Sequence, residues 1–88
     1  MTYRRTVRFK HELQQLPLEV QHIARAKFAL FCRDWQHPSL KVHKLHGALW
    51  HGHQVFDLYV THRYRVLFVI DHEVVVAVSI GSHGIVSK

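Results

Sequence analysis

Two apolar runs near the end of the chain, separated only by a polar turn, constrain its fold most. Residues 64–70 and 73–80 are mostly apolar, and Asp71-His72 lies between them. Strands that are apolar on both faces are typical of the middle of a sheet, where neither face meets water. Neither run approaches the roughly 18 residues that a membrane helix requires. We therefore expect two adjacent central strands, Tyr64–Ile70 and Glu73–Ile80, and no membrane span.

Two further strands are expected before this pair. Residues 55–60 alternate, which places side chains on two opposite faces of a strand. One face carries Phe56, Leu58 and Val60, and the other carries Val55, Asp57 and Tyr59. A tight connection, Thr61-His62-Arg63, leads into the next strand, and Lys41–His46 forms a shorter strand that Gly47 closes.

The first half of the chain is expected to be largely helical. The alternation from Tyr3 to Phe9 predicts a strand with Tyr3, Val7 and Phe9 on one face, followed by a short helix over Lys10–Leu16. Pro17 suits the first turn of a second helix, which we expect to run to Trp35 before His37-Pro38 ends it. The apolar stripe of that helix consists of Val20, Ile23, Ala24, Phe28, Phe31 and Trp35.

The resulting order is β-α-α-β-β-β-β, which is an α+β arrangement. Two helices are expected to pack on one face of a small, mostly antiparallel sheet, as a single domain over residues 1–88. Cys32, the one cysteine, lies in an apolar run and is expected to be buried. One cysteine forms no internal disulfide, and the first residues contain no apolar signal segment, so a cytoplasmic protein is expected.

The charge balance favours an anionic partner. The chain has 12 Lys and Arg against 6 Asp and Glu, which gives a net charge of +6, and ten histidines add to this on mild acidification. Nucleic acid is the natural polyanion for such a surface. An acidic protein partner, or a basic surface that only aids solubility, are the alternatives.

Several short segments together resemble a known family. They are His37-Pro38-Ser39-Leu40, His43-Lys44-Leu45-His46-Gly47, Phe56-Asp57-Leu58-Tyr59-Val60, Tyr64-Arg65-Val66-Leu67-Phe68 and Ile80-Gly81-Ser82-His83. In this order they resemble the RelE/ParE toxin superfamily, and within it the YafQ-like toxins. The resemblance implies a RelE-like fold with a curved sheet, and a toxin of a type II toxin–antitoxin system.

The same resemblance implies an activity and partners. It implies a ribosome-dependent, metal-independent endoribonuclease that cuts mRNA and inhibits translation, with no cofactor, and a cognate antitoxin that silences it. The ParE branch inhibits DNA gyrase and is the runner-up. Gly84 and Ser87 stand where cleaving members often have an acidic and an aromatic residue, so a catalytically weak module that binds RNA or antitoxin is a further alternative.

The site residues follow from the same motifs. Histidine suits the acid and base of metal-free RNA cleavage, and arginine suits stabilisation of the phosphorane charge. The catalytic residues implied are His83, Arg65 and His43. Beyond these, we expect RNA to be bound by cations that can contact phosphate and by polar or aromatic neighbours: Lys41, Lys44, Arg63, Tyr59 and His46.

Plainer roles exist for the same residues. Arg65 would also fit a cross-strand pair with Asp57, Tyr59 would fit a packing role, and the lysines would fit ordinary solvated charges. A metal site is the rival for a histidine-rich chain, because His51 and His53 would share a face on a strand. No CxxC or HExxH motif accompanies them, so no metal is expected.

Overall fold

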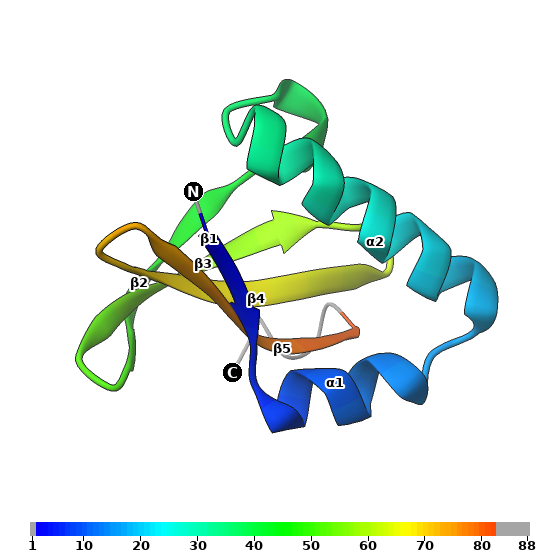
Figure 1. Ribbon diagram of the computed structural model, residues 1–88, viewed down its shortest axis with the longest axis horizontal. Coiled ribbons are helices and arrows are strands. Elements are labelled where there is room, and N and C mark those ends of the chain that lie inside the picture. The colour runs from blue at the N-terminus through cyan, green and yellow to red at the C-terminus, as the bar shows by residue number, and fades with distance from the viewer. Residues whose placement is uncertain (1, 83–88) are drawn as a thin grey trace.

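The computed structural model describes residues 2–82 of the 88-residue chain, and His83, Gly84 and Ser87 lie outside the described residues. The elements follow the expected order, with one 3₁₀ turn (η1) added before the second strand (Figure 1). Their bounds are β1 Thr2–Arg5, α1 Val7–Gln14, α2 Leu18–Arg33, η1 Pro38–Leu40, β2 His43–Trp50, β3 His53–Tyr59, β4 Tyr64–Asp71 and β5 Val74–Ser82.

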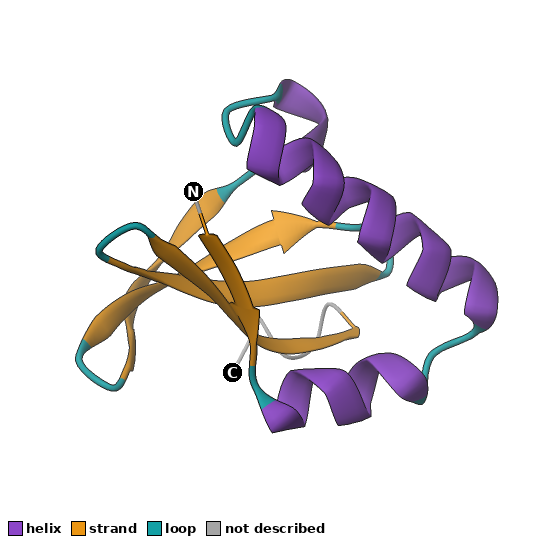
Figure 2. Ribbon diagram, viewed as in Figure 1, coloured by secondary structure: helices purple, strands orange, loops and turns teal. Residues whose placement is uncertain are grey.

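The five strands form one mixed sheet in the order β1-β5-β4-β3-β2 (Figure 2). Only the β1–β5 pair is parallel, and the other three pairs are antiparallel. The two apolar runs become β4 and β5, neither of which lies at an edge of the sheet. The prediction of an α+β fold with a mostly antiparallel sheet and central apolar strands is therefore confirmed.

The two faces of the sheet are buried in different ways. The helix-covered face packs against both helices and forms the larger core, with Phe9 and Leu13 from α1, Phe28 and Phe31 from α2, and strand residues such as Phe68. The opposite face, called the open face here, has a smaller cluster. It consists of Val55, Val69 and Val78, with Leu45, Ala48, Trp50, Leu67 and Val76 packed around them. No helix among the described residues is long and apolar enough to cross a membrane.

The first strand is shorter than the alternation from Tyr3 to Phe9 predicts. It ends at Arg5, and Thr6 caps α1 by accepting a hydrogen bond from the Phe9 N–H at 3.0 Å. The Thr6 hydroxyl also donates to the Val78 carbonyl at 2.9 Å, which fixes the cap to β5. Val7 is therefore helical and 82% exposed, and the helix predicted over residues 10–16 begins three residues earlier.

The second helix ends before Trp35. Asp34 has φ −154°, which takes the chain out of the helical conformation, so Trp35 leaves the apolar stripe and is 46% exposed. Pro17 stands at the N-cap, one residue outside the helix, where its missing N–H costs no helical bond. Cys32 is exposed, which contradicts the expectation that it is buried; it follows Phe28 by one helical turn and lines the open hollow between α2 and β1.

The strand expected over residues 41–46 is displaced and longer. Lys41 adopts a left-handed conformation, with φ 45°, and lies outside the sheet, so β2 begins at His43. Gly47 does not close the strand. Its φ of 81° accompanies a register shift against β3, and β2 continues to Trp50.

Candidate nucleic-acid interface

Tyr59, the last residue of β3, is surrounded by three cationic side chains from three different parts of the chain. The Lys41 ammonium lies 4.8 Å from the centroid of its ring, the Arg65 guanidinium 4.9 Å and the Lys27 ammonium 5.6 Å. These four residues are called the Tyr59 cluster here. Each distance is within the range of a cation–π interaction. An anion placed among the three cations would be attracted by all of them.

Strand pairing places Arg65 beside Tyr59. The two residues are register partners on β4 and β3, so their side chains share a face of the sheet. Tyr64 and Val66, the neighbours of Arg65, pack into the helix-covered core, so alternation turns Arg65 away from that core. In this register Asp57 stands opposite Leu67, one row further along the sheet.

The Arg65 guanidinium is only partly satisfied by the described chain. Its Nε and Nη1 atoms are buried, and within residues 2–82 neither has a hydrogen-bond partner. Buried N–H groups of a cation are costly when they have no acceptor. The geometry of a guanidinium suits two oxygens of one phosphate or carboxylate, so an oxyanion matches this group.

Lys41 and Lys27 reach the cluster by different routes. Lys41 follows η1, and its left-handed backbone turns the chain toward β2. Such a conformation costs a non-glycine residue about 1–2 kcal/mol. Lys27 lies on α2 and also donates a hydrogen bond to the Ser39 carbonyl at 3.4 Å. Lys27 could not be selected from the sequence, because its only signal is a position off the apolar stripe, which most solvated lysines share.

His43 occupies the neighbouring row of the same face. It is the exposed first residue of β2, and its register partner on β3 is Asp57, which is only 5% exposed. Tyr59 is two residues along β3 from Asp57, so the diagonal separation between the positions of His43 and Tyr59 is about 7–8 Å. A titratable imidazole and a carboxylate therefore lie next to the Tyr59 cluster.

The remaining predicted residues lie elsewhere. Lys44 is the register partner of Phe56, which packs on the helix-covered core. Alternation therefore places the Lys44 side chain on the face of the sheet opposite to that of His43. The Arg63 guanidinium lies 5.9 Å from the centroid of Tyr64 and not over Tyr59. His46 lines a separate hollow of about 340 Å³ on the open face, beside Arg8, Leu45, Trp50 and Leu67. His83 lies outside the described residues, so its predicted role stays a prediction.

His51 and His53, the candidate ligands of the alternative metal site, lie at a hairpin turn. His51 lies in the turn between β2 and β3 with φ 49°, so it does not share a strand face with His53. The Asp71 carboxylate contacts His72 Nδ1 at 2.8 Å and His53 Nε2 at 3.3 Å. The His72 hydrogen bond, and to a lesser degree His53, hold the pKa of Asp71 below its usual value. Among residues 2–82, no group of three or more His, Cys, Asp or Glu is arranged to hold a metal ion.

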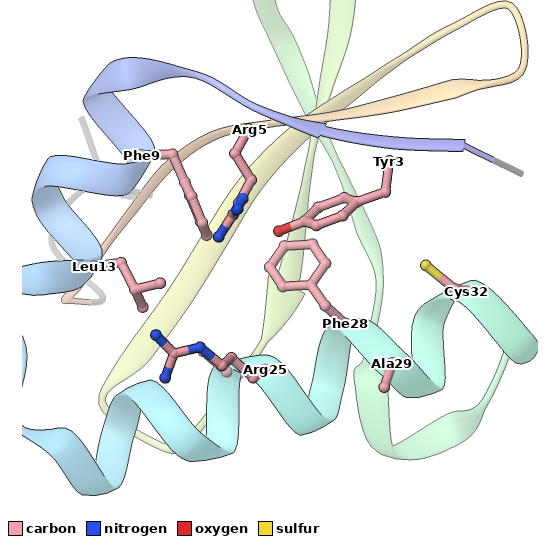
Figure 3. Close-up of a pocket in the computed structure, with 9 residues that line it drawn as sticks. Tyr3, Arg5, Phe9, Leu13, Arg25, Phe28, Ala29 and Cys32 are labelled. Carbon is pink, nitrogen blue, oxygen red and sulfur yellow. The ribbon is translucent and has the colours of Figure 1, made fainter.

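A second, apolar hollow lies between β1 and the two helices (Figure 3). Its volume is about 250 Å³. Arg5 of β1 and Arg25 of α2 lie on opposite sides of it, and Phe9 and Phe28 form part of its wall. Burial raises the pKa of Tyr3, another lining residue, to about 12. The strand of this hollow, β1, is separated from β3 and Tyr59 by two strands, whereas the lining residues on α2 share that helix with Lys27.

Comparison with known proteins finds no matching family model and no curated protein of similar sequence. Solved structures do match. A chain of the archaeal RelE–RelB complex from Pyrococcus horikoshii OT3 is 15% identical with a TM-score of 0.73, covering 94% of each chain. A YafQ variant from E. coli is 11% identical with a TM-score of 0.76, covering 98% of this chain and 97% of that chain. A chain of the E. coli DinJ–YafQ toxin–antitoxin complex is 13% identical with a TM-score of 0.73, covering 94% of this chain and 92% of that chain.

At identities this low, a structural match establishes the fold. The predicted architecture, two helices packed on one face of a small, mostly antiparallel sheet in the order β-α-α-β-β-β-β, is confirmed by the structure and these matches. The chain therefore has the fold of the RelE-like toxins.

Proposed function

We propose that this chain is the toxin of a type II toxin–antitoxin system and that it cuts mRNA on the ribosome without a metal ion. The observation that carries the proposal is the Tyr59 cluster. Lys27 from α2, Lys41 from the segment after η1, and Arg65 from β4 surround one ring. His43 lies in the next row of the same face, on a fold shared with RelE-like toxins. This arrangement combines a phosphate-binding site with a group that transfers protons near neutral pH.

The proposed chemistry needs only side chains of this chain. A base removes the proton from a 2′-hydroxyl, the 2′-oxygen bonds to phosphorus, and the bond from phosphorus to the 5′-oxygen breaks. An acid protonates the departing 5′-oxygen, which leaves a 2′,3′-cyclic phosphate and a 5′-hydroxyl. His43 and His83 are the proposed proton-transfer residues. Arg65, with Lys41 and Lys27, is proposed to stabilise the charge that develops on the phosphate oxygens.

The partly satisfied guanidinium of Arg65 supports this assignment. Phosphate oxygens of a bound strand would supply acceptors for its buried Nε and Nη1, which have none within residues 2–82. The cation–π contact with Tyr59 holds the guanidinium in place before RNA arrives, so little side-chain entropy is lost on binding.

An antitoxin is the proposed protein partner. The similar chains come from complexes described as RelE–RelB and DinJ–YafQ toxin–antitoxin. The net charge of +6 favours a partner with an acidic segment. Co-expression with the product of the neighbouring gene should give a stable complex and restore growth. Failure of that product to bind would count against a toxin–antitoxin pair.

The central experiment is induced expression in a bacterium, with growth and mRNA cleavage measured together. Wild type should arrest growth and cut mRNA, and His83→Ala, His43→Ala and Arg65→Ala should each lose both effects. His11→Ala and Lys10→Ala, which change exposed side chains on α1, serve as matched controls and should behave as wild type. With purified components, cleavage should require ribosomes and should persist in EDTA.

Two outcomes would overturn the nuclease. Growth arrest without mRNA cuts, unchanged by His83→Ala, would indicate a ParE-like gyrase inhibitor, which needs no proton transfer. RNA or antitoxin binding without arrest or cleavage would indicate a binding module, consistent with Gly84 and Ser87 at the end of the chain.

A further inference from the structure

Trp35 follows α2 in the chain and lines a hollow on the surface, although its spacing in the sequence fits the apolar stripe of that helix. The indole is 46% exposed. The hollow has a volume of about 310 Å³ and is lined by Trp35, Gln36, His37, Pro38, Lys41 and Val42. Neither predicted catalytic residue of the strands, His43 or Arg65, lines it.

The exposure of an indole is informative here. The exposed large hydrophobic residues of the described chain are Val7, Leu18, Trp35 and Leu49, and Trp35 alone among them is aromatic. Tryptophan is usually buried over most of its area because its large apolar surface is costly in water. An exposed indole face offers a flat surface on which a nucleobase of any identity can stack.

The hollow shares a residue with the Tyr59 cluster. Lys41 lines the hollow, and its ammonium lies 4.8 Å from the centroid of the Tyr59 ring. A phosphate bound by the cluster would therefore place the attached nucleotide at the mouth of the hollow. This continuity of positive charge with an aromatic surface is what sites for single-stranded nucleic acid require.

His37 adds a polar group to the hollow. Its Nδ1 accepts a hydrogen bond from the Ser39 N–H at 3.2 Å, and the Ser39 hydroxyl lies 2.9 Å away. When Nδ1 is the acceptor, the neutral imidazole carries its proton on Nε2. The ring is thus held by η1, and its second nitrogen is a donor suited to an oxygen or nitrogen on a base edge.

We propose that this hollow is a base-binding subsite for single-stranded RNA. A nucleobase stacks on Trp35 within reach of His37, while its phosphate lies against Lys41. The proposal rests on the proposed function only in taking RNA as the ligand, and it does not require that the chain cuts RNA.

The fluorescence of Trp35 provides the test. The chain has two tryptophans, so Trp50→Phe leaves Trp35 as the one indole that reports on binding. A single-stranded oligouridylate of about six nucleotides should quench this fluorescence. An abasic ribose-phosphate strand of the same length carries the same charge and should bind without quenching.

Affinity of the full chain for the same two probes tests the role of the indole. Trp35→Ala should weaken binding of the oligouridylate about tenfold and leave binding of the abasic strand unchanged. Trp35→Phe keeps a stacking surface and should recover most of the loss. Leu18→Ala, which truncates an exposed apolar side chain on α2, is the matched control and should change neither affinity.

The outcomes separate this subsite from the proposed nuclease. Quenching by the oligouridylate in a chain that cuts no mRNA would support the subsite and overturn the nuclease. Cleavage of mRNA with equal oligouridylate affinities for wild type, Trp35→Ala and Trp35→Phe would overturn the subsite alone. Weaker antitoxin capture by Trp35→Ala, with RNA affinity unchanged, would assign the hollow to a protein interface and also overturn the subsite.

Discussion

At the scale of single residues, Lys41 combines an unfavourable backbone with a side chain that the site uses. Its φ of 45° is costly for any residue with a Cβ, yet this turn carries the ammonium to the Tyr59 ring. Lys41→Gly removes the backbone strain of about 1 kcal/mol but adds a similar entropy cost through the flexible unfolded chain. The substitution also removes one cation from the cluster.

We expect Lys41→Gly to leave the Tm almost unchanged and to weaken binding of a short single-stranded RNA roughly tenfold, about 1.4 kcal/mol. Thermal melting and fluorescence titration measure the two effects separately. Lys10→Ala removes the same charge from exposed α1 and should change the affinity much less. A lower Tm with unchanged RNA affinity would mean that Lys41 serves the fold and not the site.

Alternation along the strands explains which site residues the sequence could predict. Arg65 and Tyr59 follow from it, because both stand opposite to apolar neighbours in regular strands, and the register makes them partners. The His43-Lys44 motif could not be divided in the same way, since consecutive residues of a strand face opposite sides and only the pairing with β3 shows which one joins the site. Lys27 required the tertiary placement of α2.

At the scale of elements, one carboxylate ties α1 to β5. Glu12 Oε1 accepts hydrogen bonds from the Ser79 hydroxyl at 2.8 Å and from the Ile80 N–H at 3.2 Å. The register of β5 against β4 shifts between Leu67 and Phe68, next to these residues, so the ladder is irregular where Glu12 enters. Glu12 Oε2 also accepts from Arg8 Nε at 3.2 Å.

Glu12→Ala should therefore destabilise the protein by about 1–3 kcal/mol, because Ser79 is fully buried and loses its acceptor. Each kcal/mol should lower the Tm by about 4–8 °C in a domain of this size. Arg8→Ala removes only the partly exposed ion pair on the same carboxylate, and its cost should stay under about 0.5 kcal/mol. Equal Tm values for the two variants would show that the bonds to β5 contribute nothing measurable.

The errors in predicting the elements lie at boundaries and have local causes. The alternation over residues 3–9 suited a strand because Tyr3 and Phe9 are both on the core side, although they belong to different elements. Thr6 is a favourable N-cap residue and so indicates that a helix starts there. The alternation of residues 3–9 indicates a strand, and the sequence alone does not decide between the two. The apolar stripe extends the predicted second helix to Trp35, whereas the backbone leaves the helical conformation at Asp34.

At the scale of the whole molecule, the helices cover one face of the sheet, and on the open face a smaller cluster of strand residues is buried without a helix. The order of elements and the central apolar strands were predictable, because patterning alone decides which strands have both faces buried. The edges were not, since the parallel pairing of β1 with β5 joins the first and last strands in the sequence and has no local signal. The sequence shows the positive charges only as a net charge. The fold places three of them around Tyr59.

This placement predicts how RNA binding depends on salt. If binding were driven by the net charge of +6, any lysine would contribute alike; if it depends on the Tyr59 cluster, three cations dominate. For single strands, each contact between a Lys or Arg side chain and the phosphate backbone contributes about −0.7 to the slope of log K against log salt concentration. At about pH 8, where histidine is neutral, we expect a slope near −2.

Arg65→Ala and Lys27→Ala should each reduce the magnitude of this slope by about 0.7, whereas Lys10→Ala should leave it unchanged, although all three lower the net charge equally. Equal reductions in all three variants would mean that the whole surface attracts RNA and that the cluster is not a defined phosphate site.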